Sequence, residues 1–237
     1  MMNKKTRNWL IAIVAIVVIV GIGGYTFLKS YMGNNVAIES VVPTESASAE
    51  GTTSTTTGQS VTGSELNGNW AINESTSKVY FSVTTSQETV NFVDNKVSGT
   101  WNVNVDDPSQ MTSEGQIDMS AIDSGNSQRD GHVKEADFFD VSQFPNATFK
   151  ATSFENVPTE WASGATNEFK MTGTLTVKGV EKEATFDMKS VYQDGQLLLS
   201  GTTKVTFADF GMTNPHSVVL STENDINVQL ELVLDKK

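Results

Sequence analysis

The chain has 237 residues, no cysteine and a formal net charge of −12. The absence of cysteine excludes disulfides, thiolate nucleophiles and thiolate metal sites. Residues 32–237 carry 12 basic and 28 acidic groups, a net charge of −16. A surface this acidic repels phosphate backbones, which argues against nucleic-acid binding, and its simplest role is to keep the protein soluble.

The first element is an uncharged apolar stretch from Trp9 to Leu28, dominated by Ile, Val and Ala. A helix of this length spans about 30 Å, which matches the hydrocarbon core of a bilayer. Basic side chains within residues 1–8 precede it, so these residues should stay in the cytoplasm and the rest should be extracytoplasmic. We therefore predict a single-pass transmembrane helix over residues 9–28.

A cleaved signal peptide is the alternative interpretation of this stretch. Its apolar run is longer than the roughly 7–15 residues of a signal h-region. The Ala-x-Ala-like site, Ala47-Ser48-Ala49, lies far beyond its end. We favour the uncleaved anchor, and nothing in the stretch indicates a helix partner or an oligomeric state.

Residues 29–67 form the predicted linker, which is rich in Ser, Thr, Glu and Gly. Such a segment buries too little apolar surface to offset its ordering entropy, so we expect disorder from Gly33 to Asn67. About 35 flexible residues have a reach of about 30–35 Å. The linker would hold the following domain near the membrane and leave it free to tumble.

Residues 68–237 consist mainly of short alternating apolar runs separated by turn signals. Val79, Phe81 and Val83 alternate with polar or smaller neighbours, and the run from Ile226 to Leu234 is the clearest case. About eight such runs predict a single all-β domain, an antiparallel β-barrel whose closure removes exposed edges. An eight-stranded barrel either fills its interior with side chains or holds one ligand, and periodicity does not separate these outcomes.

The stretch from Ser127 to Phe154 interrupts this pattern. Its first half does not alternate, and its charged residues suit a short exposed helix. Its second half alternates, with Ala147, Phe149 and Ala151 on one face. We predict a short helical lid that leads through Pro145 into a strand.

The same stretch resembles the YceI-like family of bacterial polyisoprenoid-binding proteins. The resemblance rests on Arg-Asp-x-His at 129–132, Asp-Phe-Phe-Asp at 137–140 and Phe-Pro-x-Ala-x-Phe at 144–149, and it continues through 173–180 and Asp-Phe-Gly at 209–211. It covers roughly residues 68 to 235. It implies a lipocalin-like barrel with an apolar cavity for a long-chain amphiphile and an extracytoplasmic location, at the bacterial cell surface or in the periplasm.

The inward-facing apolar residues are first of all core candidates. The resemblance gives them a second role as the wall of a lipid cavity, and the residues concerned are Phe81, Val83, Trp101, Val103, Phe149, Leu175, Phe186, Met188, Phe207 and Leu230. No cofactor is expected beyond a bound isoprenoid or quinone-like lipid.

Arg129, Asp130 and His132 are the candidates for a charged site. No nucleophile elbow, zinc-protease motif or phosphate loop accompanies them, so we expect no catalysis. Two histidines exclude a multi-histidine metal site, and no spacing supports a mixed one. We interpret the three residues as tying the lid to the barrel through charge-assisted hydrogen bonds. The alternative is that they frame the ligand mouth together with Phe138 and Phe139 and contact a headgroup.

The resemblance also implies an Arg shortly before the Asp-Phe-Gly motif, where this chain has Phe207 and Ala208. The missing cation and the acidic charge favour a neutral or weakly polar ligand, such as a quinone, polyprenol or fatty amide, over a pyrophosphate. The predicted function is that of a membrane-anchored protein that sequesters or carries such a lipid. The alternative is a surface or stress-related module with a filled core that acts through protein contacts.

Overall fold

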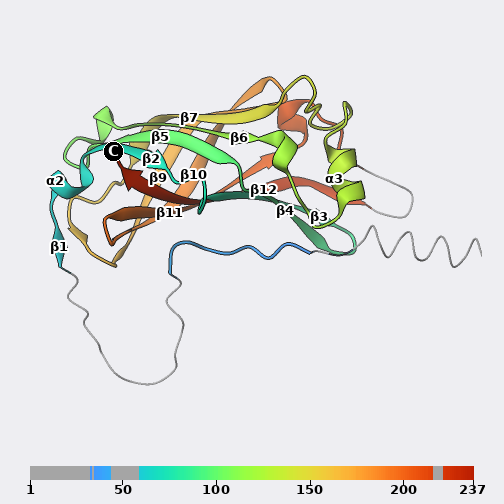
Figure 1. The fold of residues 1–237 in the computed structure, drawn as a ribbon. Coiled ribbons are helices and arrows are strands. Elements are labelled where there is room, and N and C mark those ends of the chain that lie inside the picture. The colour runs from blue at the N-terminus through green and yellow to red at the C-terminus, as the bar shows by residue number, and fades with distance from the viewer. Residues whose placement is uncertain (1–32, 34, 44–58, 216–220) are drawn as a thin grey trace, which may run out of the picture.

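The computed structural model describes residues 33, 35–43, 59–215 and 221–237 (Figure 1). The predicted transmembrane helix over residues 9–28, the middle of the predicted linker and His216 lie outside these residues. Among the helices that are described, none has the length and apolar character needed to cross a bilayer.

Most of the described chain forms antiparallel strands, with a few short helices between them. In chain order the elements are β1 (Ser60–Val61), α2 (Gly63–Leu66), β2 (Gly68–Ile72), β3 (Lys78–Thr85), β4 (Thr89–Asp94), β5 (Val97–Val103), η1 (Pro108–Gln110), β6 (Thr112–Asp118), η2 (Met119–Ala121), α3 (Ser127–Val133), β7 (Asn146–Glu155), β8 (Trp161–Ala162), β9 (Thr166–Val177), β10 (Val180–Gln193), β11 (Gln196–Thr206), η3 (Ala208–Phe210) and β12 (Thr222–Lys236).

Eight of these strands close into a ring, in the order β2-β5-β6-β7-β9-β10-β11-β12. The long strand β12 closes it, because one edge pairs with β11 and the other with β2. The edge of β12 that pairs with β2 near the end of the strand pairs with β3 along the rest of its length. Because β4 pairs with β3, the β3–β4 hairpin extends the barrel wall at one end. The predicted antiparallel barrel of about eight strands is therefore confirmed.

The barrel interior is built by strict alternation along the strands. In β10, Ala184, Phe186 and Met188 are buried while Glu183, Thr185 and Asp187 are exposed, as expected for strands with one wet face. Gly173 on β9 shows how closely the interior is packed. A Cβ atom there would lie 2.6 Å from the ring of Phe149, so only glycine leaves room for that ring.

The two ends of the barrel are built differently (Figure 1). One end, which we call the plugged end, is filled by Leu66, Trp70 and Trp161. The indole N–H of Trp70 donates to the carbonyl of Leu66 at 2.8 Å, and β1 pairs with β8 beside them. This end leaves a cavity of only about 20 Å³.

The other end, which we call the lid end, is covered by residues 119–145 between β6 and β7. Helix α3 begins at its cap Asn126, whose side chain accepts hydrogen bonds from the N–H groups of Gln128 and Arg129. A short helix was predicted in this region, but it is not exposed throughout, because Arg129 and Asp130 are buried. The charge of these two residues had suggested exposure, but their polar side-chain atoms form hydrogen bonds within the protein.

Part of the stretch predicted to be a flexible linker contacts the barrel. Residues 33 and 35–43, which we call the strap, run along the outer wall over β3 and β12 (Figure 1). Val42 is buried, and so are the outward-facing Tyr80 and Glu231. The disorder expected from Gly33 onward is thus wrong for these residues, because hydrogen bonds to buried polar groups hold the strap where apolar burial alone would not.

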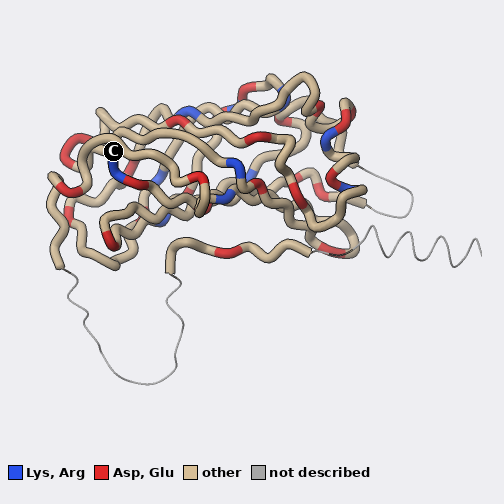
Figure 2. The backbone as a smooth tube through the Cα atoms, viewed as in Figure 1, with Lys and Arg blue, Asp and Glu red and all other residues tan. Residues whose placement is uncertain are grey.

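Acidic residues are spread over strands and loops of the whole barrel, with basic residues among them (Figure 2). No single face gathers them. This distribution suits the interpretation of the acidic charge as a source of solubility.

Candidate functional site

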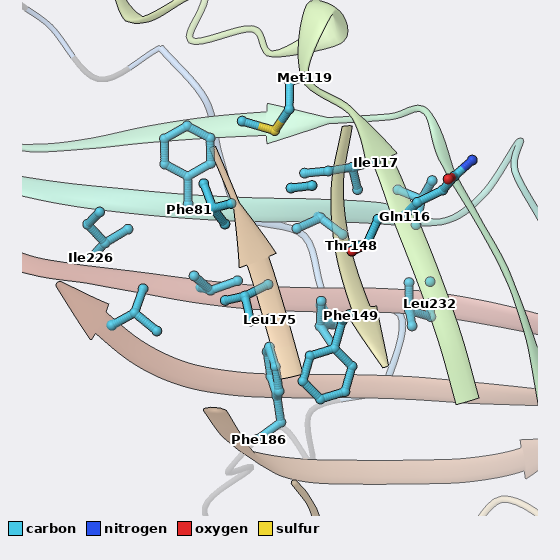
Figure 3. A pocket seen from close by; sticks show the side chains of 18 of the residues that line it. Phe81, Gln116, Ile117, Met119, Thr148, Phe149, Leu175, Phe186, Ile226 and Leu232 are labelled. Carbon is cyan, nitrogen blue, oxygen red and sulfur yellow. The ribbon is translucent and has the colours of Figure 1, made fainter. Parts of the chain in front are cut away.

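The barrel encloses an apolar inner cavity of about 130 Å³ (Figure 3). Phe149, Leu175 and Phe186 point into it from three neighbouring strands. The ring of Phe149 packs edge-on against that of Phe186, with their centroids 5.2 Å apart. The lining is apolar apart from Ser113, Gln116 and Thr148, so this space offers almost nothing to a polar ligand.

A second, outer cavity of about 140 Å³ lies at the lid end, between the β3–β4 hairpin, α3 and the segment after η3. Glu88, Arg129 and His132 are its ionisable lining residues, and the rest of its wall is mainly apolar. The outer cavity therefore combines a polar rim with an apolar interior.

The two cavities adjoin each other at Phe81 and Phe139. Both residues line both cavities, as do Met212 and Ile226. The Phe139 ring meets the Phe81 ring edge-on with centroids 5.6 Å apart. Phe139 comes from the lid, is only partly buried and lies outside the strands of the sheet.

The size of each cavity limits what it can hold. Each is close to the roughly 150 Å³ of an apolar cavity that accepts a benzene-sized molecule. Sites for larger organic ligands usually measure about 300 Å³ or more. Each cavity alone is therefore smaller than such a site.

The charged residues of the lid bind to the loop before α3. Arg129 Nε donates to Ser124 Oγ at 2.9 Å, and its Nη2 donates to the carbonyls of Ser124 at 3.1 Å and Gly33 at 3.0 Å. The Asp130 carboxylate accepts from the N–H of Ser124 at 2.8 Å and from its hydroxyl at 2.5 Å. These hydrogen bonds join α3 to Ser124 within the lid and to Gly33 of the strap.

His132 is placed differently from these two residues. It is exposed, its Nδ1 lies 3.2 Å from Glu135, and its ring packs edge-on against Phe138. Asp130 and His132 thus have different partners, Ser124 and Glu135. Within the described part of the chain, no group of three or more histidine or carboxylate side chains could hold a metal ion.

Most residues predicted to form the cavity wall do line a cavity. The inner cavity is lined by Phe81, Trp101, Phe149, Leu175, Phe186 and Leu230, and the outer one by Phe81, Val83, Phe207 and the predicted mouth residues Phe138 and Phe139.

Val103 and Met188 line neither cavity, contrary to the prediction. Val103 faces the small cavity at the plugged end, and Met188 packs where Gly201 leaves space. The reason is geometric: a period of two shows which residues point inward but not how far along the barrel axis they lie.

Several lining residues escaped the sequence prediction because they lie on turns. Met119, Phe210 and Met212 all contact the inner cavity from irregular segments. Phe210 belongs to the Asp-Phe-Gly motif, which could have identified it. Asp209 fixes this turn, since its carboxylate accepts from the N–H of Thr206 at 2.8 Å and pairs with Lys182 at 2.7 Å.

Asp94 is a buried carboxyl group at the end of β4. Its Oδ1 accepts from the N–H of Lys96 at 2.8 Å, whereas its Oδ2 has no hydrogen-bond partner. Burial raises the pKa of Asp94 to about 6. Asp94 lies outside both cavities, so it bears on stability near neutral pH.

Comparison with known proteins identifies the family of this barrel. Residues 70–234 match the model of the YceI-like domain. The chain belongs to the YceI-like family. A UPF0312 protein of Pseudomonas putida is 29% identical over 119 residues, which cover 48% of this chain and 58% of that protein. Protein YceI of Salmonella arizonae is 32% identical over 95 residues, covering 40% of this chain and 46% of its own length. The matched stretches thus span about half of these curated YceI relatives.

Solved structures show that the YceI-like fold extends over the whole barrel. BcnA of Burkholderia cenocepacia superposes with a TM-score of 0.59 at 19% identity, over 68% of this chain and 98% of its own. A polyisoprenoid binding domain from Saccharophagus degradans has a TM-score of 0.59 at 14% identity, over 71% and 98% of the two chains. The YCEI protein of Campylobacter jejuni has a TM-score of 0.53 at 24% identity, over 62% and 85%.

Proposed function

We propose that this YceI-like protein is a membrane-anchored, extracytoplasmic binding protein that holds a long-chain amphiphilic lipid, a polyisoprenoid or a related molecule, without catalysis. The observation that carries the proposal is the pair of adjoining apolar cavities, with charged residues only around the outer one. The similar Saccharophagus domain, described as polyisoprenoid binding, supports the ligand class.

Burial of the chain supplies the affinity in this proposal. Each buried CH₂ contributes about 0.8 kcal/mol, so ten buried carbons contribute about 8 kcal/mol. Association itself costs about 4 kcal/mol or more. Short chains that fill only one cavity would therefore bind weakly, whereas chains that occupy both would be retained.

The headgroup in this proposal is neutral or weakly polar. Phe207 lines the outer cavity where the family resemblance implies a nearby cation. Arg129 lines it as well, but its guanidinium donates to Ser124 and Gly33 and lies over the Phe92 ring. A prenyl alcohol should thus bind more tightly than the matching prenyl pyrophosphate, as measured by titration calorimetry. A preference for the pyrophosphate would refute this part.

Membrane anchoring is the part of the proposal that rests on sequence alone. Its support is the uncharged stretch Trp9–Leu28 with basic residues before it. Protease added to spheroplasts, in which both the cell surface and the periplasm are accessible, should cleave off the barrel domain and leave an N-terminal fragment in the membrane fraction. Recovery of the intact chain in a washed soluble fraction would refute the anchor.

The second candidate function is a non-catalytic module that acts through protein contacts. The observation in its favour is the small volume of each cavity taken alone. Native mass spectrometry of residues 33–237, purified without detergent, discriminates between the two candidates. A bound mass in the range of a prenyl or acyl lipid supports lipid binding. A protein that stays apo after incubation with quinones, polyprenols and fatty amides supports the contact module.

A further inference from the structure

The strap begins at the mouth of the outer cavity. The N–H of Gly33 donates to Glu88 Oε1 at 2.6 Å, and the carbonyl of Gly33 accepts from Arg129 Nη2 at 3.0 Å. Glu88 and Arg129 both line the outer cavity. The point where the strap meets the barrel is therefore part of the rim.

From the rim the strap follows the outer wall. Asn91 Nδ2 donates to the carbonyl of Val36 at 2.9 Å, and Lys78 pairs with Glu39 at 2.7 Å. These contacts keep the strap along the β3–β4 hairpin and then along β3, leading away from the lid end (Figure 1).

The strap ends on a buried carboxylate. Glu231 on β12 is 0% exposed although it faces outward, and its Oε2 accepts from the N–H of Val41 at 2.7 Å and from Ser40 Oγ at 3.1 Å. Its Oε1 accepts from Ser200 Oγ at 2.7 Å and from Gln229 Nε2 at 2.6 Å. A buried carboxylate without such donors is costly, so the strap and Glu231 stabilise each other.

The attachment of the strap changes the length of the tether. Leu28 ends the predicted anchor and lies five residues before Gly33. Five residues span at most about 18 Å when fully extended. A tether that reached as far as Asn67 would have a reach of about 30–35 Å and would leave the orientation of the barrel free.

We propose that the strap holds the lid end of the barrel toward a lipid bilayer, so that the outer cavity opens toward the membrane surface. This inference rests on the anchoring proposed above and deepens the lipid-binding function. A ligand then passes from the bilayer into the barrel over a short distance. A barrel held in this orientation does not tumble freely, contrary to the expectation from the sequence.

The chemistry of the lid end suits a zwitterionic bilayer rather than an anionic one. The lid, residues 119–145, carries five acidic residues (Asp123, Asp130, Glu135, Asp137 and Asp140) against Arg129 and Lys134, and Glu88 lies at the same end. Arg129 donates to Ser124 and Gly33, and Lys134 donates to the carbonyl of Ser120. Electrostatic attraction therefore does not bring the lid end to the membrane. The short tether does so by keeping the local concentration of bilayer high.

Site-specific labels test the orientation directly. The chain has no cysteine, so each introduced cysteine is unique. Gln143→Cys places a label in the lid and Thr159→Cys places one between β7 and β8, toward the plugged end; both residues are exposed. Strand β7 has ten residues and separates them, which corresponds to about 25 Å along a tilted barrel axis. The full chain is reconstituted into phosphatidylcholine vesicles that contain an acceptor lipid, and energy transfer is measured.

We expect markedly stronger energy transfer from Gln143→Cys than from Thr159→Cys. Val41→Pro removes an N–H from which Glu231 accepts a hydrogen bond, so it should loosen the strap and reduce this difference, and a circular dichroism melt checks that the barrel remains folded. Val41→Ala keeps the N–H and is the matched control, which should behave as the parent chain.

Three outcomes overturn the proposal: equal transfer from both labels in the parent chain, stronger transfer from Thr159→Cys, or a difference that Val41→Pro does not reduce. Flotation of the vesicles and native mass spectrometry keep the causes apart. Failure to float refutes the anchor and this proposal together, whereas a bound lipid with equal transfer from both labels refutes only the orientation.

Discussion

At the residue scale, we predict that Phe139, which lines both cavities, limits the passage between them. Phe139→Ala removes the aromatic ring, and the ligand no longer has to break its edge-on contact with Phe81. Such a contact is worth about 0.5–1.5 kcal/mol, so a C20 prenyl alcohol should bind about two- to tenfold more tightly. Phe138→Ala is the control, because Phe138 lines only the outer cavity. Equal effects of both variants in calorimetry would contradict the role of Phe139.

Asp94 gives a prediction about pH at the same scale. Its folded pKa of about 6 lies above the ordinary 3.8, so ionisation opposes folding. The penalty is complete above about pH 6 and disappears as the pH falls toward 3.8. Asp94→Asn should therefore be more stable than the parent chain at pH 7.5, by at most about 3 kcal/mol, since the pKa rises from 3.8 to about 6 and each pKa unit is worth about 1.36 kcal/mol.

Urea denaturation between pH 4 and pH 7.5 measures this difference. The advantage of Asp94→Asn should shrink as the pH falls through the window from 6 to 3.8. Asp118→Asn is the control of opposite sign, because hydrogen bonds from Ser120 lower the pKa of Asp118. An advantage for Asp94→Asn that does not change with pH would contradict the assignment.

At the element scale, the strap and β12 depend on each other through Glu231. Glu231→Gln removes the charge to which four hydrogen bonds are donated. Hydrogen bonds to charged groups contribute about 1.5–3 kcal/mol each, so we expect a loss of at least about 2 kcal/mol in the free energy of unfolding. Asp225→Asn on the same strand breaks only an exposed pair with Lys204 and should cost less than about 1 kcal/mol.

Hydrogen exchange adds a local readout to this comparison. The amide of Val41 should exchange faster in Glu231→Gln than in the parent chain or in Asp225→Asn. Unchanged protection of that amide, with stability equal in the two variants, would show that the strap does not depend on Glu231.

The elements also show what the sequence could and could not predict. Alternation along β10 and β12 predicted the strands, because burial of one face of a strand produces an alternation of apolar and polar residues. The strap has no comparable sequence pattern. Tyr80 and Glu231 stand at outward positions and are buried only because another segment covers them, and nothing in the sequence of β3 or β12 shows that cover. The lid helix was predicted only in part. Its charged residues indicated a helix, but the sequence did not show that Arg129 and Asp130 would be buried.

At the scale of the whole molecule, the barrel has one plugged end and, at the lid end, a second cavity that adjoins the inner one. The family signature and the alternation predicted the barrel. They did not predict its closure through β12, which pairs with β2 and β3 on one edge. They also did not predict the division of its interior, because the depth of a residue along the axis depends on strand tilt and stagger. For this reason the prediction could not separate Val103 and Met188, which line neither the inner nor the outer cavity, from the other wall residues.

If the barrel binds a lipid chain as proposed, we expect the plugged end to limit the length of that chain. Affinity for prenyl or alkyl alcohols should rise by about 0.8 kcal/mol per CH₂ while the chain still gains buried length, and then level off. We expect the buried chain to end at Trp101, because Trp101 lines both the inner cavity and the small cavity at the plugged end. Trp101→Leu should join these spaces and shift the plateau to longer chains, while shorter chains bind as before.

Displacement of a fluorescent fatty probe by a series of chain lengths measures this plateau. A circular dichroism melt confirms that Trp101→Leu remains folded, and Phe149→Leu is the control because it enlarges the inner cavity without opening it toward the plugged end. The same plateau in Trp101→Leu and the parent chain would mean that the chain enters from the lid end but never reaches Trp101. The outer cavity and the Phe139 boundary would then define the whole site. An equal shift in both variants would mean that volume, and not the position of the plug, limits the chain.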